Sequence, residues 1–234
     1  MHHRYTCVLL STDELHLADP VEQFVRAHFD VRHVSRHARS EKVFPAAVCQ
    51  LVDTDDIDLF LNFLAPMIVP ARVLERIRGE AINFHPAPPA WPGIGSASYA
   101  LYRGDDTFGA TAHRMTTTVD GGTIIRVTRF PVTPDDTCDA LSREGRRSCL
   151  SLLYEVGDEF VRHGRVSPSG DLWERAAITR AEFERWMIIM PGDPPEDIAR
   201  KVRALRHPLF PGPFMLVNGV PVALDGELGR GVHD

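Results

Sequence analysis

The sequence predicts an α/β protein with a doubly wound, mostly parallel sheet and a small C-terminal region of helices and a β-hairpin. Over the first 165 residues, short apolar runs alternate with amphipathic stretches, which is typical of strands joined by helices. Beyond a polar linker at 167–170, there remain helical patterns and one Asn-Gly turn between apolar runs. We therefore expect a core domain at 1–165 and a smaller region at 166–234.

The elements of the first half follow from the periodicity of the apolar residues. Helices are expected where apolar side chains recur on one face, and strands where a short run is apolar throughout. Polar residues that favour helix starts separate the first strand from the first helix. The predicted strands are 5–10, 31–34, 57–63 and 80–84, and the predicted helices are 20–29 and 71–78.

The second half begins with a loop at 86–93 that contains four prolines. Proline removes backbone donors and fixes φ, so this loop is rigid and is neither a helix nor a central strand. It follows directly from the end of a strand, which is where ligands bind in open α/β sheets. After it we predict helices at 96–102, 137–162, 180–190 and 195–206, strands at 109–115 and 122–130, and hairpin strands at 214–217 and 220–224.

Composition excludes several classes of protein. Twenty-six Lys and Arg against 32 Asp and Glu give a net charge of −6, which argues against binding to nucleic acid by neutralising phosphates. No apolar run approaches the ~20 residues of a membrane-spanning helix, and the first residues do not resemble a signal peptide. The cysteines form no CxxC pair and the histidines show no metal-ligand spacing. We expect a cytoplasmic protein with no membrane partner, no nucleic-acid partner and no metal.

The segment Gly93-Ile94-Gly95 does not indicate a dinucleotide site. It follows prolines and not a strand, it lacks a third glycine, and it has no lysine of a P-loop. The context that such a motif requires, a strand leading into a helix, is missing.

Asn83, His85 and Asp120 are better candidates for a catalytic site. Asn83 and His85 alternate at the end of a predicted strand, so both project to the same side. Asp120 lies in a glycine-flanked loop that reaches the same edge of the sheet. An amide donor, an imidazole and a carboxylate suit acyl transfer without a covalent enzyme intermediate. The alternative is that Asn83 and His85 only cap the strand and hydrogen-bond the loop.

Two motifs resemble the formyltransferases that depend on N10-formyltetrahydrofolate. The stretch INFHPAPPAWPG at 82–93 resembles their NxHP loop, and GATAH at 109–113 with DGGTII at 120–125 resembles their GxTxH…DxG segment. The resemblance implies a Rossmann-like core, Asn83, His85 and Asp120 as the catalytic residues, and N10-formyltetrahydrofolate as the co-substrate. The loop is one residue shorter than the common HPSLLP form of the family, and Ala87 replaces its serine.

The C-terminal region resembles the tail of sugar N-formyltransferases, through KVRALRHP at 201–208 and the later Asn218-Gly219. This implies a bacterial enzyme that formylates a nucleotide-linked amino sugar, such as dTDP-4-amino-4,6-dideoxyglucose or an isomer, for lipopolysaccharide or another cell-surface glycan. It also implies a homodimer. Residues 165–234 hold 9 basic and 10 acidic side chains, 9 − 10 = −1, which is a poor charge for binding tRNA.

Other functions stay open at this point. The amine could belong to methionyl-tRNA or glycinamide ribonucleotide, the acceptors of related enzymes. A non-catalytic sensor of folate or nucleotide sugar would keep the same pockets. A purely structural interaction protein would use the apolar hairpin at 214–224 as a dimer surface and would not need the loop chemistry.

The resemblance also implies the residues that bind the two substrates. The predicted folate contacts are Met67, Ile68, Val69, Thr116, Thr117, Thr118 and Val119, held largely through backbone groups. The predicted contacts to the nucleotide sugar are Trp91, Lys201 and Arg203. The alternatives are apolar packing for 67–69, a loop anchor for Trp91, and a solvated helix face for 200–203. His113 lies near the catalytic residues in the family pattern, or is a hydrogen-bonded strand histidine.

Overall fold

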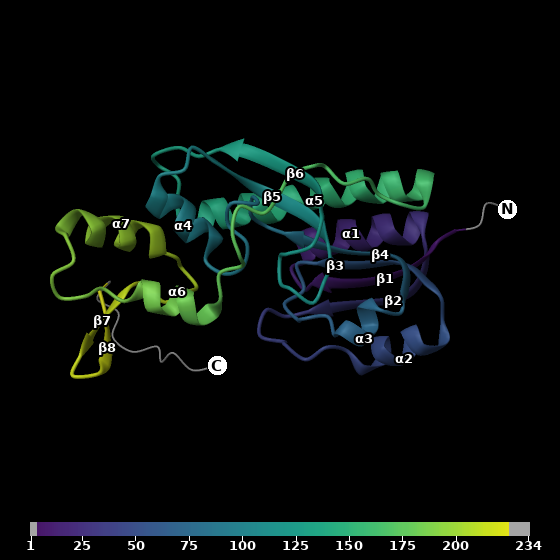
Figure 1. The fold of residues 1–234 in the computed structure, drawn as a ribbon, viewed down its shortest axis with the longest axis horizontal. Coiled ribbons are helices and arrows are strands. Elements are labelled where there is room, and N and C mark those ends of the chain that lie inside the picture. The colour runs from purple at the N-terminus through teal and green to yellow at the C-terminus, as the bar shows by residue number, and fades with distance from the viewer. Residues whose placement is uncertain (1–3, 225–234) are drawn as a thin grey trace.

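The structure is a computed structural model that describes residues 4–224. Its main sheet has six strands, and Figure 1 shows helices on both faces of this sheet. The strand order is β2-β1-β3-β4-β5-β6. Neighbouring strands from β2 to β4 pair in parallel, whereas β5 is antiparallel to both β4 and β6. The predicted mostly parallel, doubly wound sheet is therefore confirmed. The strands are β1 (Thr6–Thr12), β2 (Asp30–His37), β3 (Ile57–Phe63), β4 (Ile77–His85), β5 (Thr107–Arg114) and β6 (Ile124–Pro131).

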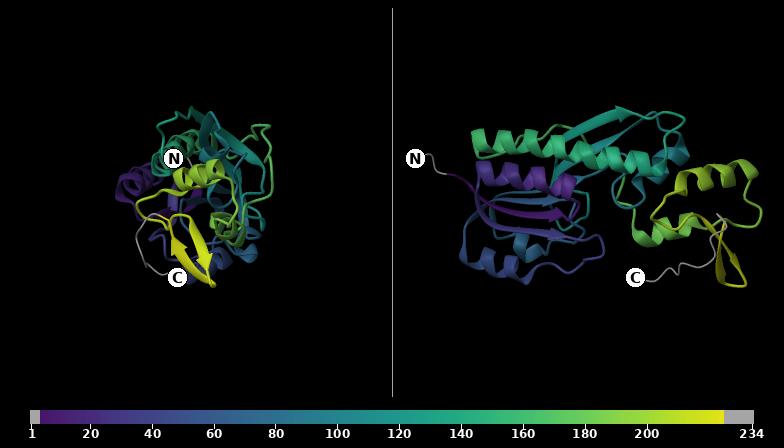
Figure 2. Two further views of the ribbon diagram at one scale, coloured as in Figure 1. Left: turned by 90° about the vertical axis from the view of Figure 1, so that its left-hand side faces the viewer. Right: turned by 180° about the vertical axis from the view of Figure 1, so that it is seen from behind.

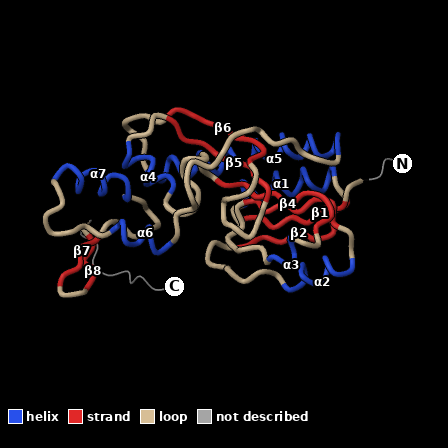
Figure 3. The backbone as a smooth tube through the Cα atoms, viewed as in Figure 1, coloured by secondary structure: helices blue, strands red, loops and turns tan. Residues whose placement is uncertain are grey.

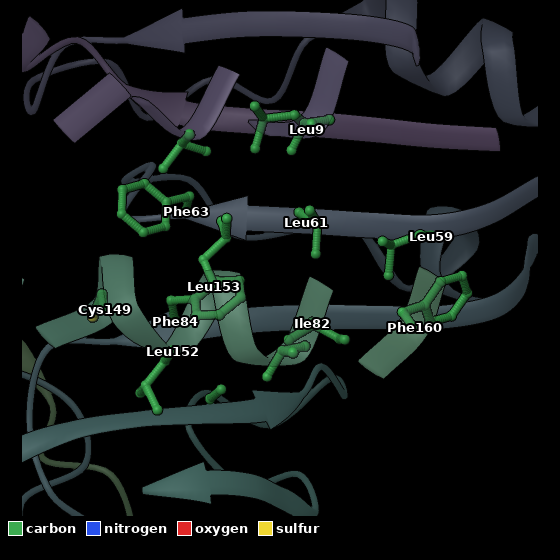
Figure 4. Packing of buried hydrophobic residues seen from close by; sticks show 14 of the residues in the cluster. Leu9, Leu59, Leu61, Phe63, Ile82, Phe84, Cys149, Leu152, Leu153 and Phe160 are labelled. Atoms are coloured by element: carbon green, nitrogen blue, oxygen red, sulfur yellow. The ribbon is translucent and has the colours of Figure 1, made fainter. Parts of the chain in front are cut away.

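Alternating side chains on the strands form a hydrophobic cluster on each face of the sheet. Along β3, Leu59 and Leu61 join the cluster under α1 and α5, whereas Phe60 joins the cluster with α2 and α3. Figure 4 shows the first of these clusters, in which strand residues meet side chains of α5 such as Phe160. The helices are α1 (Leu15–His28) and α5 (Cys138–His163) on one face, and α2 (Ala46–Thr54) and α3 (Ala71–Leu74) on the other.

The structure corrects two of the predicted helices in this core and adds a third helix. α1 begins before the predicted start at 20 and includes Pro20, because apolar residues in its first turns are buried. α2 was not predicted at all. The helix predicted to continue to 78 ends at Leu74, because Ile77 pairs with Ile57 as the first residue of β4. In each case burial or strand pairing outweighs the local preference.

The C-terminal region lies beside α4, away from the N-terminal strands (Figures 1 and 2). Here the helix predicted over 180–190 ends at Met187. Ile178 and Ala204 share a hydrophobic cluster with Trp91 of the proline loop and with α4, so this region packs against the core. The predicted division at 165 stays a prediction. The elements are α4 (Ser96–Arg103), α6 (Arg180–Met187), α7 (Pro195–Leu205), β7 (Phe214–Val217) and β8 (Val220–Ala223), and Figure 3 shows the loops between them.

Within residues 4–224, none of the helices combines the length and the apolar character that crossing a membrane requires.

Candidate active site

Three polar side chains form a row across the middle of the sheet, near the ends of β3 and β4. Asn62 of β3 is the partner of Asn83 in the parallel register, and Asn83 is the partner of His113 in the antiparallel register. Their side chains are linked, because Asn62 Nδ2 donates to Asn83 Oδ1 at 3.1 Å and Asn83 Nδ2 lies 3.0 Å from His113 Nε2. Cross-strand pairing thus fixes the orientation of the Asn83 amide.

His113, the last residue of this row, contacts Asp120, which lies between two histidines. Its Oδ1 is 3.2 Å from His113 Nε2 and its Oδ2 is 3.2 Å from His85 Nδ1. The backbone N–H of Gly93 also donates to Oδ2, at 2.8 Å. All three of these side chains are less than 10% exposed. The structure therefore brings together Asn83, His85 and Asp120 from β4 and the loop before β6, with His113 as a fourth member.

Asp120 stays ionised in this buried position. Burial alone would raise its pKa, but the positive charge on His85, the hydrogen bond and charge of His113 and the Gly93 N–H lower the pKa to about 2. Asp120 also has a φ of +42°, in the left-handed region. Aspartate and asparagine tolerate this region better than most residues. The loop therefore holds a fixed negative charge between two imidazoles.

Both ring nitrogens of His85 face oxygen atoms. Nε2 lies 2.9 Å from the backbone oxygen of Trp91, and a carbonyl only accepts hydrogen bonds. Nδ1 faces the Asp120 carboxylate. The carboxylate and the carbonyl both accept hydrogen bonds, so each ring nitrogen of His85 faces an acceptor. His85 is therefore placed to carry a proton next to a buried carboxylate.

Of the two ring nitrogens of His113, Nδ1 has one hydrogen-bond partner and Nε2 has two possible partners. Its Nδ1 lies 2.9 Å from the backbone oxygen of Arg114, so Nδ1 carries a hydrogen. With the ring neutral, Nε2 accepts a hydrogen from the Asn83 amide. With the ring protonated, Nε2 donates to Asp120. The protonation state of His113 thus couples the amide of Asn83 to the carboxylate of Asp120.

Sequence reasoning missed two residues of this site. Asn62 is a polar side chain in the otherwise apolar run 59–63, and that contrast was the only signal for it. Trp173 lies in the linker after α5, and its ring is near-perpendicular to the rings of both His85 and His113. No motif marks Trp173, because its contacts are more than 50 residues away in the chain.

One hydrophobic cluster links the two predicted folate loops. Met115, just before the second loop, packs against the cluster that contains Met67 and Val69 of the first. Met67 and Val69 are buried, whereas Ile68 is 67% exposed and Val119 is 47% exposed. The remaining residues of the second loop, Thr116, Thr117 and Thr118, are exposed. Each loop thus exposes one apolar side chain, Ile68 or Val119.

The three predicted sugar-binding side chains have other partners. The Trp91 indole is 1% exposed, donates to Asp105 Oδ2 at 2.6 Å and stacks on Tyr99. Lys201 Nζ donates to the backbone oxygen of Ile188 at 3.0 Å, and Arg203 donates to that of Pro134 at 2.7 Å. Within residues 4–224, none of these side chains hydrogen-bonds to Asn83, His85 or Asp120, although the Trp91 carbonyl contacts His85. The same described residues contain no group of three or more His, Cys, Asp or Glu side chains that could hold a metal ion.

The family model of the formyl transferases matches residues 4–156. Among curated proteins, the chain is 26% identical over 197 residues to a methionyl-tRNA formyltransferase of Burkholderia cenocepacia. That match covers 78% of this chain and 58% of the relative, so the chain spans less than two thirds of the relative's length.

Solved structures resemble almost the whole chain. A sugar N-formyltransferase from Shewanella has a TM-score of 0.74 at 17% identity, covering 95% of this chain and 97% of that one. A 4-N formyltransferase from Francisella tularensis has a TM-score of 0.74 at 14% identity, covering 93% and 96%. An N-formyltransferase from Helicobacter canadensis, in complex with folinic acid and dTDP-3-aminofucose, has a TM-score of 0.66 at 13% identity, covering 93% and 86%. At these identities the likeness establishes the fold.

Proposed function

The chain belongs to the formyl transferase family, and we propose that it transfers a formyl group from N10-formyltetrahydrofolate to the amine of a nucleotide-linked amino sugar. The observation that carries this proposal is the convergence of Asn83, His85 and Asp120 at one edge of the sheet, with a 3.2 Å contact between His85 and Asp120. An amide donor, a proton carrier and a fixed carboxylate are the groups that formyl transfer to an amine requires.

In this proposal Asn83 stabilises the negative charge that develops on the formyl oxygen as the amine attacks the formyl carbon. Its Oδ1 is occupied by Asn62, and one hydrogen of Nδ2 points to His113. The second Nδ2 hydrogen is left for the oxyanion. Loss of such a donor typically lowers the rate by a factor on the order of 100 to 1000.

His85 and Asp120 move the proton. When His85 is neutral, its Nε2 accepts the proton of the attacking amine, for which Nε2 must exchange the Trp91 carbonyl for the amine. Asp120 stabilises the resulting imidazolium of His85. The imidazolium then donates its proton to N10 of the folate, as the bond between the formyl carbon and N10 breaks. The new amide keeps the formyl group, and tetrahydrofolate leaves with N10 protonated. Asp120 needs no proton of its own, which suits a pKa of about 2.

The loops at 67–69 and 116–119 are the proposed folate contacts. Backbone groups there would hold the pterin, while Ile68 and Val119 cover its faces. For Met67 and Val69, burial supports packing as the role of the side chains.

The amino sugar is the favoured acceptor because the Shewanella, Francisella and Helicobacter proteins resemble this chain over at least 86% of their own length. A dTDP sugar with its amine at C4 stays our proposed substrate, and the Helicobacter complex with a 3-amino sugar makes C3 the first alternative to test. Lys201 and Arg203 remain candidates for the pyrophosphate if they release their carbonyl partners, and Trp91 would reach the sugar only if its loop opened. Methionyl-tRNA is the second candidate acceptor, since the curated relative acts on it.

Location in the cytoplasm and assembly as a homodimer belong to the same proposal. The hairpin of β7 and β8 supports a dimer, because Leu216, Val217 and Val220 are each between 46% and 60% exposed. Apolar side chains grouped in this way are typical of an interface.

The test is a formyl-transfer assay with N10-formyltetrahydrofolate and a panel of dTDP-, UDP- and GDP-linked 3-amino and 4-amino sugars, with methionyl-tRNA and glycinamide ribonucleotide included. We expect an N-formyl product with one or more dTDP-amino sugars and none with the other two acceptors. Asn83→Ala and His85→Ala should abolish most of the product. Full activity of either variant would contradict the catalytic assignment, and turnover with methionyl-tRNA alone would contradict the sugar.

A further inference from the structure

The linker between α5 and α6 passes directly over the catalytic network. Its backbone is fixed at both ends, because Ser169 N donates to Ile124 O at 3.0 Å and Ile178 N donates to Pro92 O at 3.0 Å. Glu174 N donates to Pro89 O between these two points, at 3.2 Å. The linker therefore runs from the start of β6 to the proline loop.

Trp173 lies within this fixed linker and faces the two histidines. Its ring centroid is 5.1 Å from that of His113, at an interplanar angle of 83°, and 6.1 Å from that of His85, at 66°. Such near-perpendicular arrangements are favourable between aromatic rings. A protonated imidazole next to an indole gains further from the cation–π attraction.

The indole N–H of Trp173 also holds the loop that carries Asp120. Nε1 donates to the backbone oxygen of Gly122 at 2.7 Å, two residues beyond Asp120. Asp120 itself has a left-handed backbone, a conformation that persists only when its surroundings hold it. One side chain thus contacts both histidines and fixes the carboxylate between them.

We propose that Trp173 is a positioning residue for the reaction, which holds the Asp120 loop and keeps water away from His85 and His113. The role rests on the proposed formyl transfer. Water at this site would compete with the amine for the formyl carbon, giving formate and tetrahydrofolate with N10 protonated. It would also weaken the attraction between the carboxylate and the imidazoles, which is strong only at low dielectric. The linker is then a wall of the active site as well as a connection.

The kinetic test uses Trp173→Ala and Trp173→Phe, with Trp186→Phe as the matched control. Trp186 packs on Tyr99, Tyr102 and Phe183 and touches neither histidine. For Trp173→Ala we expect kcat to fall about 100-fold with the KM of both substrates within about twofold, because the groups misplaced are catalytic and not substrate-binding. Formate release without an amine should rise relative to transfer. Trp173→Phe keeps a ring over the histidines and should recover much of the lost kcat, and Trp186→Phe should stay near wild type.

A second measurement needs no substrate. A protonated imidazole quenches a neighbouring indole more strongly than a neutral one does. Wild-type fluorescence should therefore change in a pH titration, and Trp173→Phe should remove most of the change while Trp186→Phe keeps it. A wild-type kcat in Trp173→Ala, or an unaltered fluorescence titration in Trp173→Phe, would overturn the proposal. If the wild type transfers no formyl group to any acceptor, the proposed function fails. The fluorescence result then still decides whether the Trp173 indole contacts the two histidines.

Discussion

Replacing Asp120 by asparagine tests the electrostatics of the site most directly. Asparagine has nearly the same shape and tolerates the left-handed φ of +42°, so the change removes charge without adding backbone strain. The pKa of Asp120 is lowered from 3.8 to about 2, and each pKa unit corresponds to about 1.4 kcal/mol of differential interaction. Ionised Asp120 therefore contributes roughly 2 kcal/mol to the free energy of unfolding.

The sign of the pH dependence follows from the lowered pKa. The contribution is fully present above the unfolded pKa near 3.8 and is lost as the pH falls towards 2, where folded Asp120 becomes protonated. We expect Asp120→Asn to be about 2 kcal/mol less stable than wild type at pH 7, with the difference shrinking below about pH 4. Urea unfolding from pH 3 to 7 measures this, and the same substitution at exposed Asp135 is the control. The reasoning is refuted if the difference is absent at pH 7, or if it is as large at pH 3 as at pH 7.

Three further substitutions test two contacts of the candidate site and one proposed folate loop. Asn62→Ala frees Asn83 Oδ1, so we expect kcat to fall about 10-fold with little change in KM in steady-state assays. Gly93→Ala puts a Cβ 2.3 Å from the Ile178 carbonyl oxygen at a φ of +86°, so the free energy of unfolding in urea should fall by about 3 kcal/mol. Ile68→Ala removes exposed apolar surface from the first proposed folate loop, so the KM for the formyl donor should rise about fivefold with kcat nearly unchanged.

Two of these variants have a matched control. Gly104→Ala has a similar φ of +74° but nothing within 4 Å, so its smaller loss of stability separates backbone strain from the clash at Gly93. Val43→Ala also shortens an exposed apolar side chain, and should leave the KM for the donor unchanged. Equal losses at Gly93 and Gly104, an unchanged KM in Ile68→Ala, or a KM effect without a kcat effect in Asn62→Ala would each contradict the structural reason given.

Local pattern was sufficient where a contiguous apolar run or a pair of turn residues decides the backbone conformation. The run at 57–63 was predicted with its observed bounds, and the Asn218-Gly219 turn joins β7 and β8 as expected. Prediction failed where a distant contact decides. Pro20 does not end α1, because the apolar residues around it are buried against the sheet. Strand pairing between Ile57 and Ile77 ends α3 early, and no local signal at 71–78 reports that pairing.

The sequence by itself determined the order of the strands and of every helix except α2. It also determined the rigid proline loop after β4 and the placement of Asn83 and His85 on one side of a strand end. Each of these features depends on period, proline content or local alternation. Only the tertiary structure decided the rest of the site. Strand register sets Asn62 and His113 on either side of Asn83, and the linker carries Trp173 over both histidines. These contacts join residues 21 to 88 positions apart, and separations of that kind are fixed by sheet order and packing, which no local pattern records.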